Sequence, residues 1–493
     1  MKRARLASRA LLAVAGAAGA AALVACGGGG SGSAATSAPS VQPPASAVAF
    51  DGSVLLGAPT GDSVRISLLS AQQSGTVSIA YGTAGSSYDR RTAAYTLQPG
   101  QPLAMQLDGL APDTPYSYRV EFSAAGTAAP SASPPYRLQT ARPPGSSFVF
   151  TIQADSHLDE NSDLALYRRT LANVAADAPD FHVDLGDTFM AEKHAEPLSA
   201  TARPAADAAA VNARYAYERG NFGLLTHSVP LFLVNGNHDA EAGWLNDGTA
   251  ANLAVWATQA RQRYFLNPAP GSFYGGDPLG QRTSWYAWQW GDALFVVLDP
   301  YWNSTAQPSR DAWNLTLGEA QYRWLAQTLS ASRALYKFVF VHSLVGGLDG
   351  QMRGGVEAAP YFEWGGRNLD GTDGFAARRP GWNKPIHALL AENRVTAVFH
   401  GHDHLYARQS LDGIVYQAVP QPSAANTTSG PNLAREYHYA SGTILSSSGH
   451  LRATVGPESV RVDYVRAWLP KDETAQRRNA QVDDSWTVAA PAR

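Results

Sequence analysis

Two hydrophobic patterns divide the chain. From residue 48 to 140, apolar and polar residues alternate, as in the runs 64–68 and 116–120, and Gly, Pro, Asp and Ser separate the runs. A period of two is typical of half-buried strands, and short strands at this spacing without helical segments between them indicate a β-sandwich. We therefore predict an all-β sandwich over residues 48–141.

After the Pro/Gly-rich boundary at residues 141–145, short apolar runs alternate with segments of helical spacing. We expect the main strands at 148–152, 181–185, 231–234, 293–298, 338–341 and 395–399, and the helices at 164–176, 207–225, 252–264 and 317–330. This alternation predicts an α/β domain over residues 146–470, with its sheets between helices. Residues 471–493 are polar, and we expect them to form a loosely packed tail.

The N-terminus reads as a processing segment. Basic residues precede an apolar run at 10–24 that is too short to span a membrane. Small residues then lead to Cys26, the only cysteine, and a Gly/Ser-rich stretch follows it. Residues 1–25 resemble a bacterial lipoprotein signal, and residues 26–47 a flexible linker. The alternative is an ordinary secretory signal with an incidental cysteine.

Lipidation at Cys26 would place the protein in the bacterial cell envelope, on the periplasmic or extracellular face, with membrane contact through the lipid anchor only. A single cysteine excludes a disulfide and a thiolate metal site in the folded part. The formal net charge of −3 carries no polybasic signature of nucleic-acid binding. The hydrophobic content of 45% is that of a globular protein with a large core.

Polar clusters follow five of the expected strands. They are Asp155-Ser156-His157, Gly186-Asp187, Gly236-Asn237-His238-Asp239, His342 and Gly401-His402-Asp403-His404. Ligands at the carboxyl ends of strands in an open α/β sheet converge on one crevice. Carboxylate, amide and imidazole donors suit zinc, iron or manganese. Seven such donors are too many for one tetrahedral zinc, and they suit two metals that share a carboxylate.

This ordered series resembles the calcineurin-like metallophosphoesterase family over about residues 147–470. The upstream sandwich and residues 401–408 resemble the purple acid phosphatase branch, and the turn at 110–116 resembles the tyrosine corner of fibronectin type III domains. The resemblance implies a four-layer metallophosphoesterase β-sandwich flanked by helices, preceded by a fibronectin III-like sandwich. Two departures stand out: His157 replaces a glycine of that branch, and Met190 replaces its tyrosine ligand. We therefore expect no purple colour, with His157 filling the vacant coordination position.

The resemblance also implies a role for each site residue. The first metal would be held by Asp155, His157, Asp187 and His404, and the second by Asn237, His342 and His402, with Asp187 as the bridge. His238 would be the general acid, and Asp239 would orient its ring, although Asp239 could instead cap a helix. We expect Asp403, His400, His182 and His227 to be structural. Five arginines are candidates to grip phosphate: Arg353, Arg367, Arg378, Arg379 and Arg408.

These assignments predict a phosphoesterase with two divalent or trivalent transition metals (Fe, Zn or Mn). It would hydrolyse small phosphomonoesters by attack of a metal-bridging hydroxide, because two metals ~3.5–4 Å apart lower the pKa of a shared water toward ~7. Phosphodiesters are the alternative substrates, and a non-phosphate ester is a third. The alternative from another class is a surface-binding lipoprotein with a non-catalytic metal domain. Intact ligands and His238 argue against that alternative.

Overall fold

The computed structural model describes residues 47–126, 130–195, 197–277, 281–346 and 353–491. The predicted signal peptide, Cys26 and the linker up to residue 46 lie outside this part of the chain, so they stay predictions. Within the described residues, no helix has the length and apolar character needed to cross a bilayer.

The first part of the described chain is the predicted all-β sandwich. One antiparallel sheet contains β1 (Ser53–Gly57), β2 (Val64–Leu69) and β6 (Leu103–Leu107). The other contains β3 (Gly75–Thr83), β4 (Arg90–Arg91), β5 (Tyr95–Leu97), β7 (Pro115–Ala124), β8 (Ser131–Ala132) and β9 (Tyr136–Gln139). Alternate residues of both sheets, such as Ile66 and Val120, share one core. At the expected corner the Tyr116 hydroxyl accepts the Ala111 N–H at 2.8 Å, while kinship with fibronectin type III stays a prediction.

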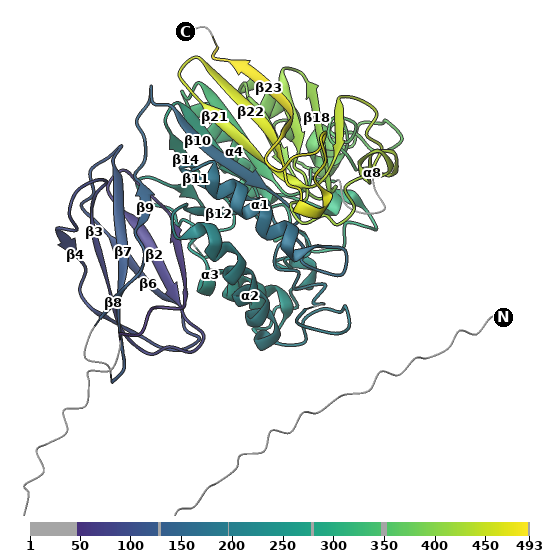
Figure 1. The fold of residues 1–493 in the computed structure, drawn as a ribbon. Coiled ribbons are helices and arrows are strands. Elements are labelled where there is room, and N and C mark those ends of the chain that lie inside the picture. Colours follow the sequence, from purple (N-terminus) through teal and green to yellow (C-terminus); the bar gives the residue numbers. More distant parts are fainter. Residues whose placement is uncertain (1–46, 127–129, 196, 278–280, 347–352, 492–493) are drawn as a thin grey trace, which may run out of the picture. The chain divides into compact units, whose positions relative to one another are not determined.

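Two further sheets form the centre of the α/β part (Figure 1). The six-stranded sheet has the order β12 (Leu231–Leu233), β11 (Phe181–Asp184), β10 (Phe148–Gln153), β21 (Gly449–Val455), β22 (Ser459–Arg466) and β23 (Val482–Ala489). The eight-stranded sheet has the order β13 (Gly275–Gly276), β14 (Tyr286–Trp290), β15 (Ala293–Val297), β16 (Tyr336–Val341), β17 (Ala397–His400), β19 (Ile414–Ala418), β18 (Leu405–Leu411) and β20 (Thr443–Ser446). Strand β10 lies beside β21, about 300 residues later in the sequence, which closes the domain on itself.

Each sheet packs the other on one face and helices on the opposite face. The inner faces meet in an aromatic core that includes Phe150, Phe295 and Phe399. Helices α1 (Leu164–Ala176), α2 (Ala208–Thr226) and α3 (Leu253–Tyr264) cover the six-stranded sheet. The helices α4 (Gly318–Ala331), α5 (Phe362–Gly365) and α7 (Ile386–Glu392) cover the other sheet, and α6 (Phe375–Arg378) and α8 (Gly430–Glu436) lie in its loops. The predicted four layers are confirmed.

The prediction of a loose polar tail at 471–493 was wrong for its second half. Strand β23 pairs with β22 along the edge of the six-stranded sheet. Trp486 is buried in the inter-sheet core, and its indole N–H donates to the Gln417 side-chain oxygen at 2.9 Å. An edge strand buries only one face, so only its alternate residues are apolar. The charged residues between them made the segment look like a polar loop in the sequence.

Helix α2 carries an arginine that ties it to the sandwich. The Arg219 guanidinium is fully buried, and it donates to the Ser67 carbonyl and hydroxyl at 2.9 and 3.0 Å and to the Ser53 hydroxyl at 3.0 Å. Burial lowers the pKa of Arg219 to about 9. Since a buried cation is stable only when its donors are satisfied, these contacts fix the first sheet of the sandwich against α2.

The neighbouring Glu218 gives a testable pH dependence of stability. Burial raises the pKa of its carboxyl from 4.5 to about 8, against the opposing charge of Arg214. Between those pH values the unfolded chain has lost this proton while the folded protein keeps it. The free energy of unfolding therefore falls as pH rises across this window.

We expect Glu218→Gln to remove this fall. The variant should gain stability over the wild type at about pH 8, by a few kcal/mol at ~1.4 kcal/mol per pH unit, and gain little near pH 4.5. Urea unfolding at both pH values measures the two differences. An equal difference at both would contradict a neutral, buried Glu218.

Candidate metal centre

The predicted site residues converge at one edge of the two central sheets. Strands β10, β11 and β12 run parallel in one sheet, and β16 and β17 run parallel in the other. Their carboxyl ends lead into Asp155, Asp187, Asn237, His342 and Gly401 respectively. The sequence-based expectation that the five polar clusters meet is confirmed.

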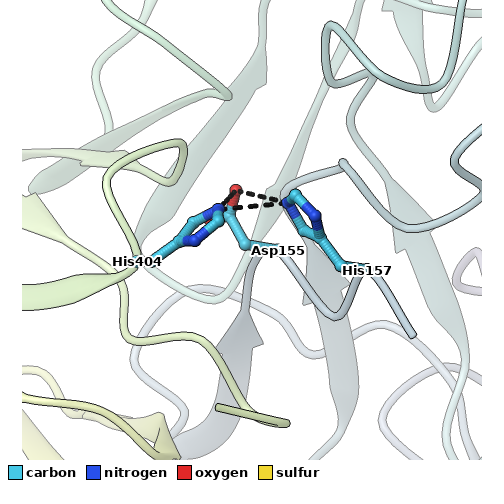
Figure 2. A group of neighbouring side chains, drawn as sticks. All are labelled: Asp155, His157 and His404. Carbon is cyan, nitrogen blue, oxygen red and sulfur yellow. Dashed lines mark hydrogen bonds and ion pairs between the residues drawn. The ribbon is translucent and has the colours of Figure 1, made fainter. Parts of the chain in front are cut away.

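The first donor group consists of Asp155, His157 and His404, whose ligand atoms all lie within 4.8 Å of one another. Figure 2 shows the three side chains pointing toward one another from separate segments. The Nε2 atoms of His157 and His404 lie 3.8 and 3.5 Å from Asp155 Oδ1, and 3.1 Å from each other. One carboxylate oxygen and two imidazole nitrogens thus surround one point.

The second donor group consists of Asp187, His342 and His402, again within 4.8 Å. His342 Nδ1–H donates to the Leu185 carbonyl at 2.8 Å, which directs Nε2 toward Asp187 Oδ2, 3.1 Å away. His402 Nε2 and the Asn237 side-chain oxygen are buried without a hydrogen-bond partner among the described residues. Buried polar atoms of this kind require a partner, and a transition metal fits both.

Asp187 lies between the two groups. Its Oδ2 is 3.6 Å from His157 Nε2 of the first group and 3.1 Å from His342 Nε2 of the second. Its Oδ1 accepts the backbone N–H of His238 at 2.7 Å. This position is the one that a carboxylate bridging two metals needs, and the donors fit a dinuclear centre.

The electrostatics of the centre favour bound cations. Burial by itself would raise the pKa of Asp187, but the charges of His342 and His238 outweigh it and hold that pKa well below its usual value. Burial would lower the pKa of His342, yet Asp187 and Asp155 raise it to about 9. Two ionised carboxylates in a buried site are stable only with positive charge beside them.

Glycine and strained backbone hold the donors together. A Cβ on Gly236 would collide with the Asp187 backbone nitrogen, and one on Gly401 would lie 2.6 Å from Asp155 Oδ2. These contacts explain the glycines of the third and fifth clusters. The backbone is left-handed at several donors, with φ of 61° at Asp155, 52° at Asp187 and 73° at His402, and such strain in non-glycine residues gathers at functional sites.

The predicted role of Asp239 was wrong. Its Oδ1 accepts the backbone N–H groups of Thr188 and Phe189 at 3.0 and 2.7 Å, and its Oδ2 accepts those of Asp187 and Gly236 at 3.0 and 2.8 Å. All its acceptor capacity therefore goes to the two loops that carry the donors, and none to His238.

A residue that the sequence did not single out lies beside His238 instead. Glu192 Oε2 is 3.5 Å from His238 Nδ1, an ion-pair distance, and the Glu192 N–H donates to the His238 carbonyl at 3.1 Å. Burial would lower the pKa of His238, but Asp187 and Glu192 raise it above its ordinary value. Glu192 belongs to none of the motifs, and only its position five residues after Asp187 could have drawn attention to it.

Asp403, which was expected to be structural, belongs to neither donor group. Its Oδ1 accepts from Arg353 Nε at 2.9 Å and its Oδ2 from the Tyr439 hydroxyl at 2.6 Å. Arg353 also donates to the His402 carbonyl at 2.6 Å, and its guanidinium lies 3.8 Å from the centre of the Tyr437 ring. The histidines expected to be structural, His182, His227 and His400, belong to neither donor group.

A cavity of about 760 Å³ opens over His157 and His404 of the first donor group and over Asp187 and His402 of the second. We call it the main cavity. Besides site residues, it is lined by Asp159, Asn161, Lys193, Arg353, Gln421, Glu436, Tyr437 and His438. Of the five candidate arginines, only Arg353 is among its lining residues, while Arg378, Arg379 and Arg408 pair with Asp311, Glu363 and Asp484. The structure thus selects one arginine from the set.

Comparisons with known proteins agree with this geometry. The family model described as calcineurin-like phosphoesterase matches residues 148–406. The structure of PhoD has a TM-score of 0.62 at 16% identity, over 91% of this chain and 92% of that one. A purple acid phosphatase from yellow lupin (Lupinus luteus) seeds has a TM-score of 0.56 at 15% identity, over 88% of this chain and 74% of that one. At these identities the two likenesses concern the fold. No curated protein matches the sequence.

Proposed function

We propose that this chain, which belongs to the calcineurin-like phosphoesterase family and is a metal-dependent phosphoric ester hydrolase, acts on phosphomonoesters. The observation that carries the proposal is the pair of donor groups that share Asp187 beneath the main cavity. Two cationic side chains, Arg353 and Lys193, line that cavity. A terminal phosphate offers several anionic oxygens to such groups, and a bidentate guanidinium contact suits it well.

The chain's own residues define how the phosphate would be held and cleaved. Bound metals supply the nucleophile at neutral pH and neutralise the phosphoryl oxygens. Arg353 reaches the cavity from a fixed position, because Asp403 and Tyr437 hold its guanidinium. His238 lies beside the centre, where it can donate a proton to the leaving oxygen, and the charges of Asp187 and Glu192 raise its pKa in the direction that a general acid needs. Glu192 Oε2 lies at ion-pair distance from Nδ1 of that ring, 3.5 Å away.

The donor set also supports a proposal on metal identity. Nitrogen and oxygen donors without thiolate suit iron, zinc or manganese. Met190 is buried at the position where the purple branch has a tyrosine ligand. We therefore propose a centre without an iron–phenolate bond, which would make the metal-loaded protein free of purple colour.

We further propose that lipidated Cys26 anchors the enzyme to the cell envelope.

Phosphodiesters are the second candidate substrates. A smaller hollow borders the centre on the Asn237 side, and His238 lines both it and the main cavity. A diester has two substituents, and two spaces that meet at the proton donor give each a place. A non-catalytic metal domain lacks comparable support, since both donor groups and His238 are complete.

The deciding experiment assays the metal-loaded full chain on p-nitrophenyl phosphate and bis-p-nitrophenyl phosphate, with metal analysis of the same sample. We expect turnover of both, with the higher kcat/KM on the monoester, because only the monoester presents a terminal phosphate to Arg353. A higher kcat/KM on the diester would make the enzyme a phosphodiesterase. Absence of hydrolysis of either by protein with a full metal complement would refute the enzymatic function.

A further inference from the structure

The small hollow beyond His238 has a composition unlike that of the main cavity. Its volume is about 170 Å³, and it is lined by Glu192, Asn237, His238, Trp244, Gln307, Pro308 and Ser309. We call it the side hollow. Glu192 is its only ionisable residue besides His238, and Trp244 and Pro308 give it an apolar wall. The main cavity, by contrast, presents Asp159, Lys193, Arg353, Glu436 and His438.

Trp244 is held in place by the chain around it. It belongs to a short 3-10 helix, Gly243–Leu245, whose first N–H donates to the Tyr301 carbonyl at 3.1 Å. A Cβ on Gly243 would collide with the Trp302 carbonyl oxygen, so this turn lies directly against the next loop. The indole meets the Tyr301 ring edge-on at 6.2 Å between centroids. Trp244 is nevertheless only partly buried, and it lines the side hollow.

The size and chemistry of the side hollow suit one planar ring. A cavity of ~150 Å³ accommodates benzene, so the side hollow, at about 170 Å³, has room for a single six-membered ring. An aromatic ring against an indole is worth ~0.5–1.5 kcal/mol beyond the area it buries. The exposed Gln307 at the same hollow can hydrogen-bond a ring substituent.

We propose that the side hollow is the leaving-group subsite, and that it selects phosphate esters whose leaving alcohol is a single aromatic ring. The proposal rests on the proposed function, because it assigns a place to the group that His238 protonates. A general acid must lie within hydrogen-bond reach of the leaving oxygen, so the leaving group has to lie next to His238. Of the two spaces that His238 lines, the charged main cavity suits the phosphoryl group, and the apolar side hollow suits the ring.

The bond changes follow from this placement. The oxygen of water forms the new bond to phosphorus while the bond from phosphorus to the leaving oxygen breaks. The bonding electron pair stays on the leaving oxygen, which takes the proton of His238, and the proton released by the attacking water restores the imidazolium. The phenol leaves through the side hollow, and inorganic phosphate leaves through the main cavity.

The test compares two substrates with the metal-loaded full chain. One is phenyl phosphate, and the other is a fluorinated alkyl phosphate whose alcohol has a pKa close to that of phenol, so that leaving-group chemistry is matched. We expect kcat/KM to favour the aryl ester about tenfold, the equivalent of one aromatic contact. In Trp244→Leu the ratio should fall toward about one, and Trp244→Phe should keep most of it.

Trp302→Leu is the matched control, because Trp302 belongs to the adjacent loop and carries the Arg282 guanidinium on its ring at 3.5 Å, away from both spaces. It should keep the wild-type ratio. Metal content is measured in each variant. A second measurement needs no variant: phenol should inhibit hydrolysis of the alkyl ester more strongly than cyclohexanol does.

A wild-type ratio near one, a ratio unchanged in Trp244→Leu, or equal inhibition by the two alcohols would each overturn the subsite. In those cases the protein would still hydrolyse both esters, and the proposed function would be unaffected. Failure of the metal-loaded protein to hydrolyse either ester would instead refute the proposed function, so the two failures are distinguishable.

Discussion

Asp187→Asn is expected to strip the protein of both metals, whereas His404→Ala should remove only one. The reason is geometric: Asp187 Oδ2 faces His157 of the first donor group and His342 of the second, while His404 faces only the first. Replacing the carboxylate by an amide removes the negative charge that both cations share. Affinity should fall by more than the ~10–100-fold that a residue supporting a ligand costs, and hydrolysis should fall below detection.

Elemental analysis after dialysis measures the metals per chain in each variant. Asp403→Asn is the matched control, because Asp403 lies between His402 and His404 in sequence but bonds Arg353 and Tyr439. It should retain both metals. Equal loss of metal in Asp187→Asn and His404→Ala would mean that His404 does not serve a single metal, and the assignment of the two donor groups would be wrong.

His238→Ala should show the opposite behaviour, with both metals kept and turnover lost. The contact between this segment and the centre runs from the His238 backbone N–H to Asp187 Oδ1, and alanine preserves it. What disappears is the protonated imidazole beside the leaving oxygen. General acids contribute ~10²–10⁴-fold, so kcat should fall by about that factor for esters of poor leaving groups and less for p-nitrophenyl phosphate.

A series of aryl phosphates with increasing phenol pKa measures this effect. The loss in kcat of His238→Ala should grow steadily along the series, and metal content should match the wild type. His227→Ala serves as a control histidine, since its ring stacks on Tyr136 in the sandwich interface and belongs to neither donor group. Release of both metals from His238→Ala, or an equal loss across the series, would show that His238 is not the proton donor.

The sequence could predict that the metal donors meet at one edge of the fold, because the direction and end of a strand depend only on residues that are neighbours in the chain. A buried parallel strand reads as an apolar run, and the residue at its carboxyl end must lie at one edge of the sheet. Asp155, Asp187, Asn237 and His342 each follow such a run, so their convergence depended on no contact between distant residues. The role of the glycines before Asp187 and His402 could be predicted as well, because a backbone that approaches another segment this closely has room only for glycine.

What the sequence left undecided were the pairings across loops. His238 lies 3.5 Å from Glu192 while the adjacent Asp239 turns to four backbone N–H groups, and no spacing rule distinguishes those two carboxylates. The selection of Arg353 from five arginines, and the placement of Trp244 next to the proton donor, depend on how separate loops pack.

By itself, then, the sequence determined where the main strands of the α/β part lie, which polar side chains follow them, and the family. The tertiary structure alone decided which carboxylate lies beside the His238 ring, which arginine lines the main cavity, and that residues 482–489 form an edge strand. The physical reason is the distance along the chain between the residues that interact. Periodicity and strand ends are fixed by neighbours along the chain, whereas a charge pair or a one-sided edge strand is fixed by partners that only the packed fold brings close.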